Sequence, residues 1–180
     1  TTALASLMDL AKTWLDVADA KTPTSMEGVS LVPLLTGEKE SVQEQIFSER
    51  NWHDNWDPIR TVVGPRYKLI QNYRPEMPYR PSLDILDSPS WESITWLQKT
   101  SGLRGKLTWY NNPNRPQVEF YDLQEDPGEW NNLADEPAFK GLVTEHQKVL
   151  SDWIRVTNDF LPPVHGAFPP AGRYKDVNPL

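Results

Sequence analysis

Apolar side chains recur three and four positions apart over the first twenty residues, which is the spacing of one face of an α-helix. The positions that share this spacing are Leu4, Leu7, Met8, Ala11, Trp14, Leu15 and Ala18. The pattern stops at Pro23, because proline is not tolerated in a helix interior. We therefore predict an amphipathic helix over residues 2–20, followed by a turn and a short helix that ends near Gly37.

Four short segments rich in β-branched and aromatic residues predict strands. These segments are residues 44–50, 59–64, 66–73 and 117–123. Gly64 and Pro65 separate the second segment from the third and predict a tight hairpin. Helical spacing returns over residues 139–157. The apolar positions of this last helix are Leu142, Val143, Leu150, Trp153 and Ile154.

The order of these elements predicts an α+β fold, in which a small four-stranded antiparallel sheet packs against a long C-terminal helix. Residues 74–116 are rich in proline at both ends and are interpreted as an insertion over the surface. A helix is expected inside it around residues 91–99, beginning at Ser88 or Ser90.

The charge and composition of the chain argue against several kinds of partner and site. The 180 residues carry a net charge of −7, which argues against nucleic acids and acidic membranes as partners, since both are bound through basic patches. No run of about 18 apolar residues is present, so no membrane span is predicted. The absence of cysteine removes disulfides, thiolate nucleophiles and zinc–thiolate sites.

The segment YDLQEDPGEWNNLA, residues 121–134, follows the last predicted strand. Its local chemistry favours a structural interpretation, in which the strand ends at Leu123 and residues 126–128 form a turn. Asp122 and Glu129 would then hydrogen-bond backbone groups and take no part in catalysis.

The segment SERNWHDNWDPIR, residues 48–60, is the stronger candidate for a site. We predict a loop between two strands that presents His53 and Asp54 beside Trp52 and Trp56. Aromatic faces next to imidazole and carboxylate groups suit a sugar, because rings stack on it and polar groups bind its hydroxyls. A surface loop anchored by tryptophan, with a solvated histidine, is the alternative, and spacing alone leaves both open.

Two further kinds of site are not predicted. One histidine with scattered carboxylates lacks any recognised metal-ligand spacing. The chain also contains no G-x-S-x-G, no phosphate-binding glycine loop and no H-E-x-x-H. By itself the chain therefore does not have the residues of a complete enzyme.

Taken together, several stretches resemble the C-terminal part of a sulfatase of the alkaline-phosphatase superfamily. They are SLMDLAKTWLDVADA, EGVSLVPLLTGE, IRTVVGPRYKLIQNY and EFYDLQEDPGEWNNLADEP. The heparan N-sulfatase branch is similar in having a histidine and an acid shortly before a Pro-x-Arg strand, here His53, Asp54, Pro58 and Arg60. The segments NYRPEMPYRPS and SPSW extend this likeness. Lys12 is a departure, because sulfatases often have proline at that position.

The resemblance implies that the catalytic groups lie in another part of the full-length enzyme. A formylglycine made from Cys or Ser, and a calcium ion, would lie upstream in the full-length enzyme, so this chain holds no catalytic residue, cofactor or metal ligand of its own and is expected to be inactive alone. Residues 1–40 would end the catalytic α/β domain, and the first helix would belong to its edge. Residues 41–162 would form the C-terminal subdomain, and residues 163–180 an irregular tail.

The resemblance also implies a substrate and partners. The full-length enzyme would hydrolyse sulfate esters or sulfamates of glycosaminoglycan-like sugars in a periplasmic, secreted or lysosomal compartment. His53 would contact the sugar, with Asp54 and Arg60 as a sugar-binding carboxylate and an anion-pairing guanidinium. The missing N-terminal domain would be a partner, and a homo-oligomer is left open. The alternatives are a phosphonate or phosphodiester hydrolase of the same superfamily and a non-catalytic carbohydrate-binding module.

Overall fold

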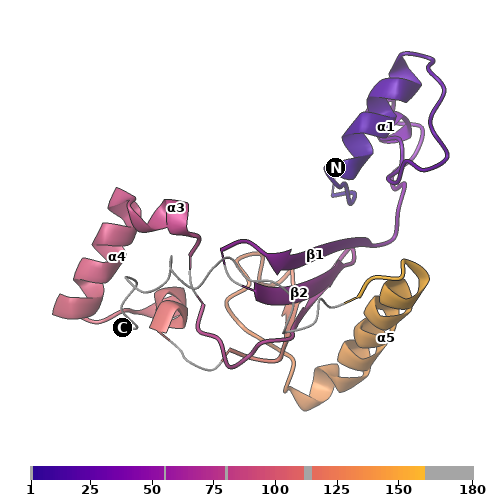
Figure 1. Cartoon of the computed structure of the whole chain (residues 1–180). Coiled ribbons are helices and arrows are strands. Elements are labelled where there is room, and N and C mark those ends of the chain that lie inside the picture. Colours follow the sequence, from indigo (N-terminus) through magenta and orange to yellow (C-terminus); the bar gives the residue numbers. More distant parts are fainter. Residues whose placement is uncertain (1, 55, 80, 112–114, 161–180) are drawn as a thin grey trace.

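The computed structural model of the chain describes residues 2–54, 56–79, 81–111 and 115–160 (Figure 1). Within these ranges, four antiparallel strands form a sheet in the order β1-β2-β3-β4, so each strand pairs with its neighbour in the sequence. The strands are β1 (Ile46–Trp52), β2 (Trp56–Val63), β3 (Tyr67–Asn72) and β4 (Val118–Asp122). The α-helices are α1 (Met8–Val17), α2 (Val32–Leu35), α3 (Leu83–Leu86), α4 (Pro89–Thr100) and α5 (Lys140–Val156), with 3-10 turns η1 (Gly105–Asn111) and η2 (Pro137–Phe139). The predicted α+β fold is confirmed.

The hydrophobic core lies between one face of the sheet and α5. Val62, Leu69 and Phe120 alternate with residues of the other face and are fully buried. They form one cluster with Val143 and Leu150 of α5. Because α5 has its apolar side chains on one stripe, it covers this face of the sheet, as the sequence predicted (Figure 1).

The opposite face of the sheet carries polar side chains that are nevertheless buried. Glu119 of β4 accepts hydrogen bonds from Asn72 Nδ2 at 2.6 Å and from the Tyr121 hydroxyl at 2.7 Å. Burial, together with the neighbouring Glu119 carboxylate, raises the pKa of Tyr121, so its phenol stays protonated and donates. These pairs satisfy groups that would otherwise destabilise the fold.

Helix α1 is tied to the loops that follow it by two buried polar residues. The Asp9 carboxylate accepts from Val29 N at 2.9 Å and from Gln43 Nε2 at 2.9 Å. The Thr13 hydroxyl donates to Asp9 O and accepts from Leu31 N at 2.9 Å. This part of the fold therefore depends on polar contacts as much as on apolar packing.

Gly28 and Lys12 fit the same arrangement. Gly28 has φ +89°, and a Cβ added to it would lie 2.7 Å from the carbonyl oxygen of Met8, so only glycine fits. Lys12 donates from Nζ to Gly28 O at 3.1 Å. The lysine thus gives α1 a contact with the next loop that proline could not make.

Several boundaries differ from the expectation. Helix α1 is shorter than the predicted 2–20, because the Asp9 carboxylate accepts from Ser6 N at 2.7 Å and the chain leaves the helix through Asp19 at φ 51°. Helix α4 begins after Ser88, one of the two predicted residues, whose hydroxyl accepts from Trp91 N at 3.2 Å. Helix α3 was not predicted. The domain boundaries stay predictions, and residues 161–162 and the predicted tail 163–180 lie outside the described residues.

The predicted loop over residues 48–60 is wrong in its extent. Strand β1 continues to Trp52, and β2 already begins at Trp56, with these two residues paired across the ladder. A register shift between Arg50 and Trp52 accommodates the polar sequence, as a bulge does in an antiparallel pair. The connection is therefore a short hairpin tip.

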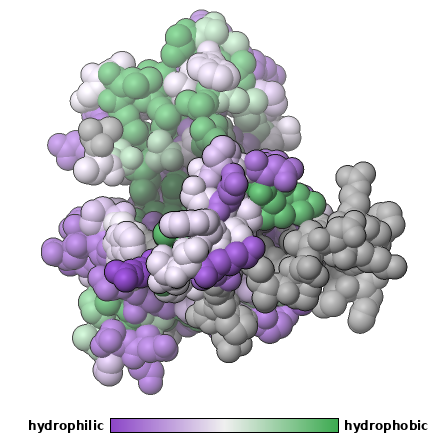
Figure 2. All heavy atoms as spheres, turned by 90° about the vertical axis from the view of Figure 1, so that its left-hand side faces the viewer, coloured by the Kyte–Doolittle hydropathy of each residue, from purple (hydrophilic) through white to green (hydrophobic). Residues whose placement is uncertain are grey.

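The apolar side chains of the N-terminal part are largely exposed. Leu7 is 86% exposed, Trp14 66% and Val17 72%, and Leu35 of α2 is 75% exposed. Figure 2 shows apolar surface gathered at the height that α1 and its following loops occupy in Figure 1. Among the described residues, no helix combines the length and apolar character needed to cross a bilayer.

Candidate functional site

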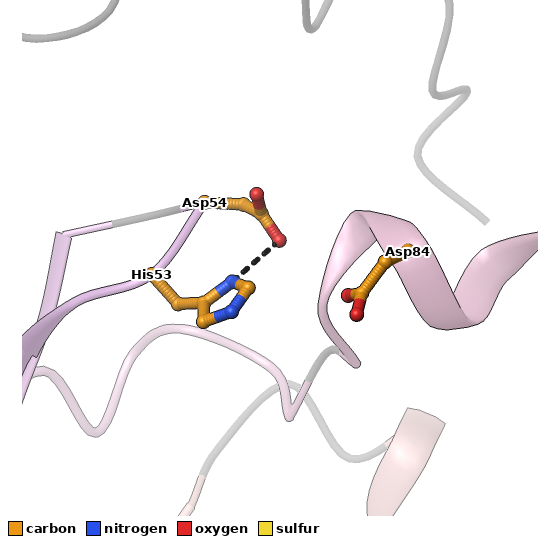
Figure 3. Close-up of side chains that lie close together, drawn as sticks. All are labelled: His53, Asp54 and Asp84. Carbon is orange, nitrogen blue, oxygen red and sulfur yellow. Dashed lines mark hydrogen bonds and ion pairs between the residues drawn. The ribbon is translucent and has the colours of Figure 1, made fainter.

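The tip of the β1–β2 hairpin and the short helix α3 bring three polar side chains together. His53 Nδ1 lies 2.9 Å from Asp54 Oδ2 at the tip. The carboxylate of Asp84 points toward both of them from α3 (Figure 3). One nitrogen or oxygen from each side chain lies within 4.8 Å of the others. The structure thus joins two residues of the predicted site to a third, Asp84, that the sequence did not indicate.

Asp54 fixes the geometry of this cluster. Its Oδ2 accepts from the backbone N–H of Leu83 at 2.6 Å, which attaches the start of α3 to the hairpin tip. This backbone hydrogen bond, with the additional contact from His53, lowers the pKa of Asp54, so the carboxylate is ionised at neutral pH. The side chain of His53 is 63% exposed. The cluster therefore presents an accessible imidazole next to two carboxylates, a set that can bind the hydroxyls of a polar ligand.

The cluster does not suit the calcium ion that the resemblance implies for the full-length enzyme. Calcium takes six to eight oxygen ligands, whereas His53 supplies nitrogen and only Asp54 and Asp84 supply oxygen. His53 and Asp54 also already hydrogen-bond each other. The expectation that this chain supplies no ligand to a family metal stays a prediction.

Aromatic side chains lie directly beside the tip. Trp52 and Trp56 are partners across the β1–β2 ladder, and Trp52 is 37% exposed. The guanidinium carbon of Arg74 lies 4.8 Å from the centroid of the Trp56 ring, a cation–π contact. The two predicted tryptophans thus form the last pair of the ladder before the tip that carries His53 and Asp54.

Asp57 connects this hairpin to the end of the insertion. Its carboxylate pairs with Arg50 and with Arg115, whose Nη1 lies 3.0 Å from Asp57 Oδ2. Arg115 is 7% exposed and also donates to the carbonyl of Arg74 at 3.1 Å. Asp57 therefore fixes the insertion against β2 and stands apart from the exposed cluster.

Arg60 is placed differently from the other predicted site residues. It lies on the α5 face of the sheet, is fully buried, and pairs with Asp159, with Nη2 2.8 Å from Oδ1. A carboxylate oxygen of Glu49 lies 3.5 Å from the same nitrogen. Pairing with Arg60 lowers the pKa of Asp159. The structure does not bring Arg60 to His53, and its proposed contact with substrate stays a prediction.

The segment over residues 121–134 uses its polar groups within the fold. Asp122 Oδ1 accepts from the backbone N–H of Gln124 at 3.1 Å and of Glu125 at 3.3 Å. Its carboxylate also pairs with Arg66 at 2.7 Å, and this contact lowers the pKa of Asp122. The structural role predicted for Asp122 is confirmed.

The second half of the segment repeats this pattern. Asn132 Oδ1 accepts from Phe120 N at 2.9 Å and from Ala134 N at 3.0 Å, so the loop is fastened to β4. Glu129 has φ 55° and pairs with Lys68 at 2.9 Å. Its partner is thus a side chain, and the prediction that it binds backbone groups is wrong.

Comparisons with known proteins agree with one another. Residues 1–90 match the family model described as "N-sulphoglucosamine sulphohydrolase, C-terminal". The chain is 28% identical over 159 residues to an ulvan-active sulfatase of Formosa agariphila, covering 85% of this chain and 29% of that protein. It is 30% identical over 173 residues to human N-sulphoglucosamine sulphohydrolase, covering 87% of this chain and 33% of that protein.

A solved structure described as a 2-O GAG sulfatase has a similar fold. It superposes with a TM-score of 0.56 at 27% identity, over 84% of this chain and 25% of that chain. The chain thus spans about a third or less of the curated relatives described above.

Proposed function

The chain belongs to the N-sulphoglucosamine sulphohydrolase C-terminal family, and from this premise we propose that it completes an enzyme that hydrolyses sulfate groups on glycosaminoglycan-like saccharides. The relatives named above are sulfatases. The bond-breaking groups, including formylglycine and calcium, belong in this proposal to the part of the enzyme outside this chain. The chain itself shapes the binding of the saccharide.

The observation that carries the proposal is the exposed cluster at the hairpin tip. His53, Asp54 and Asp84 offer hydrogen-bonding groups close together (Figure 3). Trp52 and Trp56 form the last pair of the ladder before the tip. Sugars are recognised by such combinations of polar groups and aromatic faces. We assign His53 to a direct contact with the sugar, and Asp54 to orienting that imidazole through the 2.9 Å hydrogen bond.

We also propose that the exposed apolar residues of α1, of the residue before it and of α2 dock on the N-terminal part of the enzyme. Leu7, Trp14, Val17 and Leu35 are each at least 66% exposed here, whereas large apolar side chains of this kind are usually covered in a complete protein. The polar contacts of Asp9 and Thr13 hold this surface in shape. The partner domain would supply the missing half of that interface.

The experiment that tests the sugar contact is His53→Ala in the full-length enzyme. Turnover of a sulfated saccharide is expected to fall roughly ten- to a hundredfold in kcat/KM, which is the loss of one hydrogen bond and its orientation. Turnover of a small aryl sulfate is expected to change little, because it lacks the remote sugar group.

Lys148→Ala is the matched control, because its side chain is 77% exposed on α5. It should leave both substrates unaffected. An equal loss on both substrates in His53→Ala would place His53 among the catalytic groups, and no loss on either would remove it from the site. Unchanged unfolding of the variant shows that the effect is not misfolding.

A further inference from the structure

A hollow lies on the face of the sheet opposite α5, and no residue of the cluster at the hairpin tip lines it. Its volume is about 190 Å³. The lining includes the aromatic side chains of Tyr79 and Trp130 and polar groups of Arg115, Glu119, Tyr121 and Asn132. Pockets for drug-sized ligands begin at about 300 Å³, so this cavity has room for about one six-membered ring.

The aromatic side chains come from two segments far apart in the sequence. Tyr79, from the insertion, is 38% exposed, and Trp130, from the loop after β4, is 59% exposed. The guanidinium carbon of Arg115 lies 5.8 Å from the Tyr79 ring centroid. Large aromatic faces that remain accessible beside a polar floor suit a ligand with both C–H and O–H groups.

Arg115 lines this cavity, and the fold does not use all the donors of its guanidinium. Its two terminal nitrogens bond Asp57 and the carbonyl of Arg74, while Nε is buried without a partner among the described residues. An unsatisfied buried N–H is costly, so such groups usually have a water or ligand partner. The side chain is 95% buried and therefore holds this donor in a fixed position.

The cavity is lined by one cationic side chain, Arg115, and one anionic side chain, Glu119, so its lining carries no net charge. Arg115 is paired with Asp57, and the Glu119 carboxylate accepts from Asn72 and Tyr121. Neither a net anion nor a net cation is therefore favoured. Arg115 and Glu119 together offer N–H donors and a carboxylate acceptor, which match a pair of hydroxyl groups on a neutral ring.

We propose that this cavity is an accessory carbohydrate site that binds one unsulfated pyranose ring. The ring packs against Tyr79 and Trp130, one hydroxyl accepts from the Arg115 guanidinium, and another donates to Glu119. The choice of a carbohydrate rests on the proposed function, whereas the aromatic walls, the unpaired donor and the volume do not. The site would hold an unsulfated residue of the polymer away from the reacting sulfate.

The test uses the full-length protein with 5-fluorotryptophan in place of tryptophan. Methyl glucoside is the probe, and the ¹⁹F resonance of Trp130 is identified with Trp130→Phe. We expect a saturable shift of this resonance, with a Kd on the order of 1–10 mM. Trp96 is the internal control, because it is 62% exposed on α4 and does not line the cavity, and its resonance should stay in place.

Two variants separate this site from the hairpin tip. Tyr79→Ala should weaken binding about tenfold, since it removes one wall, and His53→Ala should leave the titration of Trp130 unchanged even if it abolishes turnover. The proposal is overturned if Trp130 does not titrate, if Trp96 shifts equally, or if Tyr79→Ala binds as tightly as the unmodified protein. A titration by sodium sulfate instead of the glucoside would also overturn it, because the site would then select an anion.

Discussion

The loop that follows β4 and the tip of the β1–β2 hairpin both combine acidic residues with tryptophan, yet they use their polar side chains in opposite ways. In the loop, Asp122 and Asn132 accept hydrogen bonds from four backbone N–H groups of the same region. His53 at the tip and Asp84 in the adjacent α3 remain accessible, and only Asp54 is committed to the backbone, through Leu83.

This difference distinguishes polar side chains that stabilise the fold from polar side chains that are available to bind a ligand. A side chain whose hydrogen bonds are all made inside the fold has little left for a ligand, and its loss destabilises the protein. A side chain that a neighbour holds in place, but that still has unused hydrogen-bonding groups, can bind a ligand. Its removal should change the free energy of unfolding little. The loop and the tip are therefore expected to respond to mutation in opposite ways.

The largest expected effect is on the loop. Asn132→Ala removes the acceptor of Phe120 N and Ala134 N and also the donor to Val118 O at 3.1 Å. Because Phe120 lies in the core, its N–H is left without its side-chain partner, and we expect a loss of about 3 kcal/mol in the free energy of unfolding by urea. Asn132→Asp keeps the acceptor and should lose less. If Asn132→Ala lowered the free energy of unfolding by less than about 1 kcal/mol, the loop would not depend on its polar side chains more than the tip does.

A smaller effect is expected from pH. Pairing with Arg66 lowers the pKa of Asp122 in the folded state. The stability gained from that carboxylate is complete above its unfolded pKa of about 3.9 and is lost as the pH falls through the lower folded pKa.

The matched variant is Asp122→Asn, which has no carboxylate to titrate. The stability difference between the two proteins should therefore be largest near neutral pH and narrow below about pH 4. Urea unfolding at several pH values measures it. Parallel pH curves for the two proteins would show that the pairing with Arg66 contributes nothing.

Much of the fold was predictable because it follows from local periodicity. The spacing of Leu142, Val143 and Leu150 predicted α5, and Gly64 with Pro65 predicted the turn between β2 and β3, where Gly64 N donates to Tyr67 O at 2.8 Å. The alternation of side chains in β2 also predicts the face of the sheet on which Arg60 lies. Arg60 is two residues before Val62 and so lies on the same face, toward the core.

The remaining features depend on contacts between distant residues. Asp159, the partner of Arg60, lies 99 positions away in the sequence. Helix α3 has four residues within a proline-rich segment, too few to show a helical period, and its approach to His53 is set by the hydrogen bond between Leu83 and Asp54 across 29 positions. Asp84 was missed because no local pattern connects it with the hairpin.

The smallest effect on stability is expected at the tip. Within the part of the chain that the structure describes, the Asp84 carboxylate makes no hydrogen bond, so Asp84→Asn should change the free energy of unfolding by less than about 0.5 kcal/mol. The same variant in the full-length enzyme should lower kcat/KM for a sulfated saccharide about tenfold, because an amide is a weaker acceptor for a sugar hydroxyl than a carboxylate. Asp54→Asn is the contrasting variant, since it also weakens the contact with Leu83 N and should destabilise the protein measurably. If Asp84→Asn instead destabilises the fold as much as Asp54→Asn does, then Asp84 belongs with the structural residues of the loop, and the tip has no carboxylate reserved for the sugar.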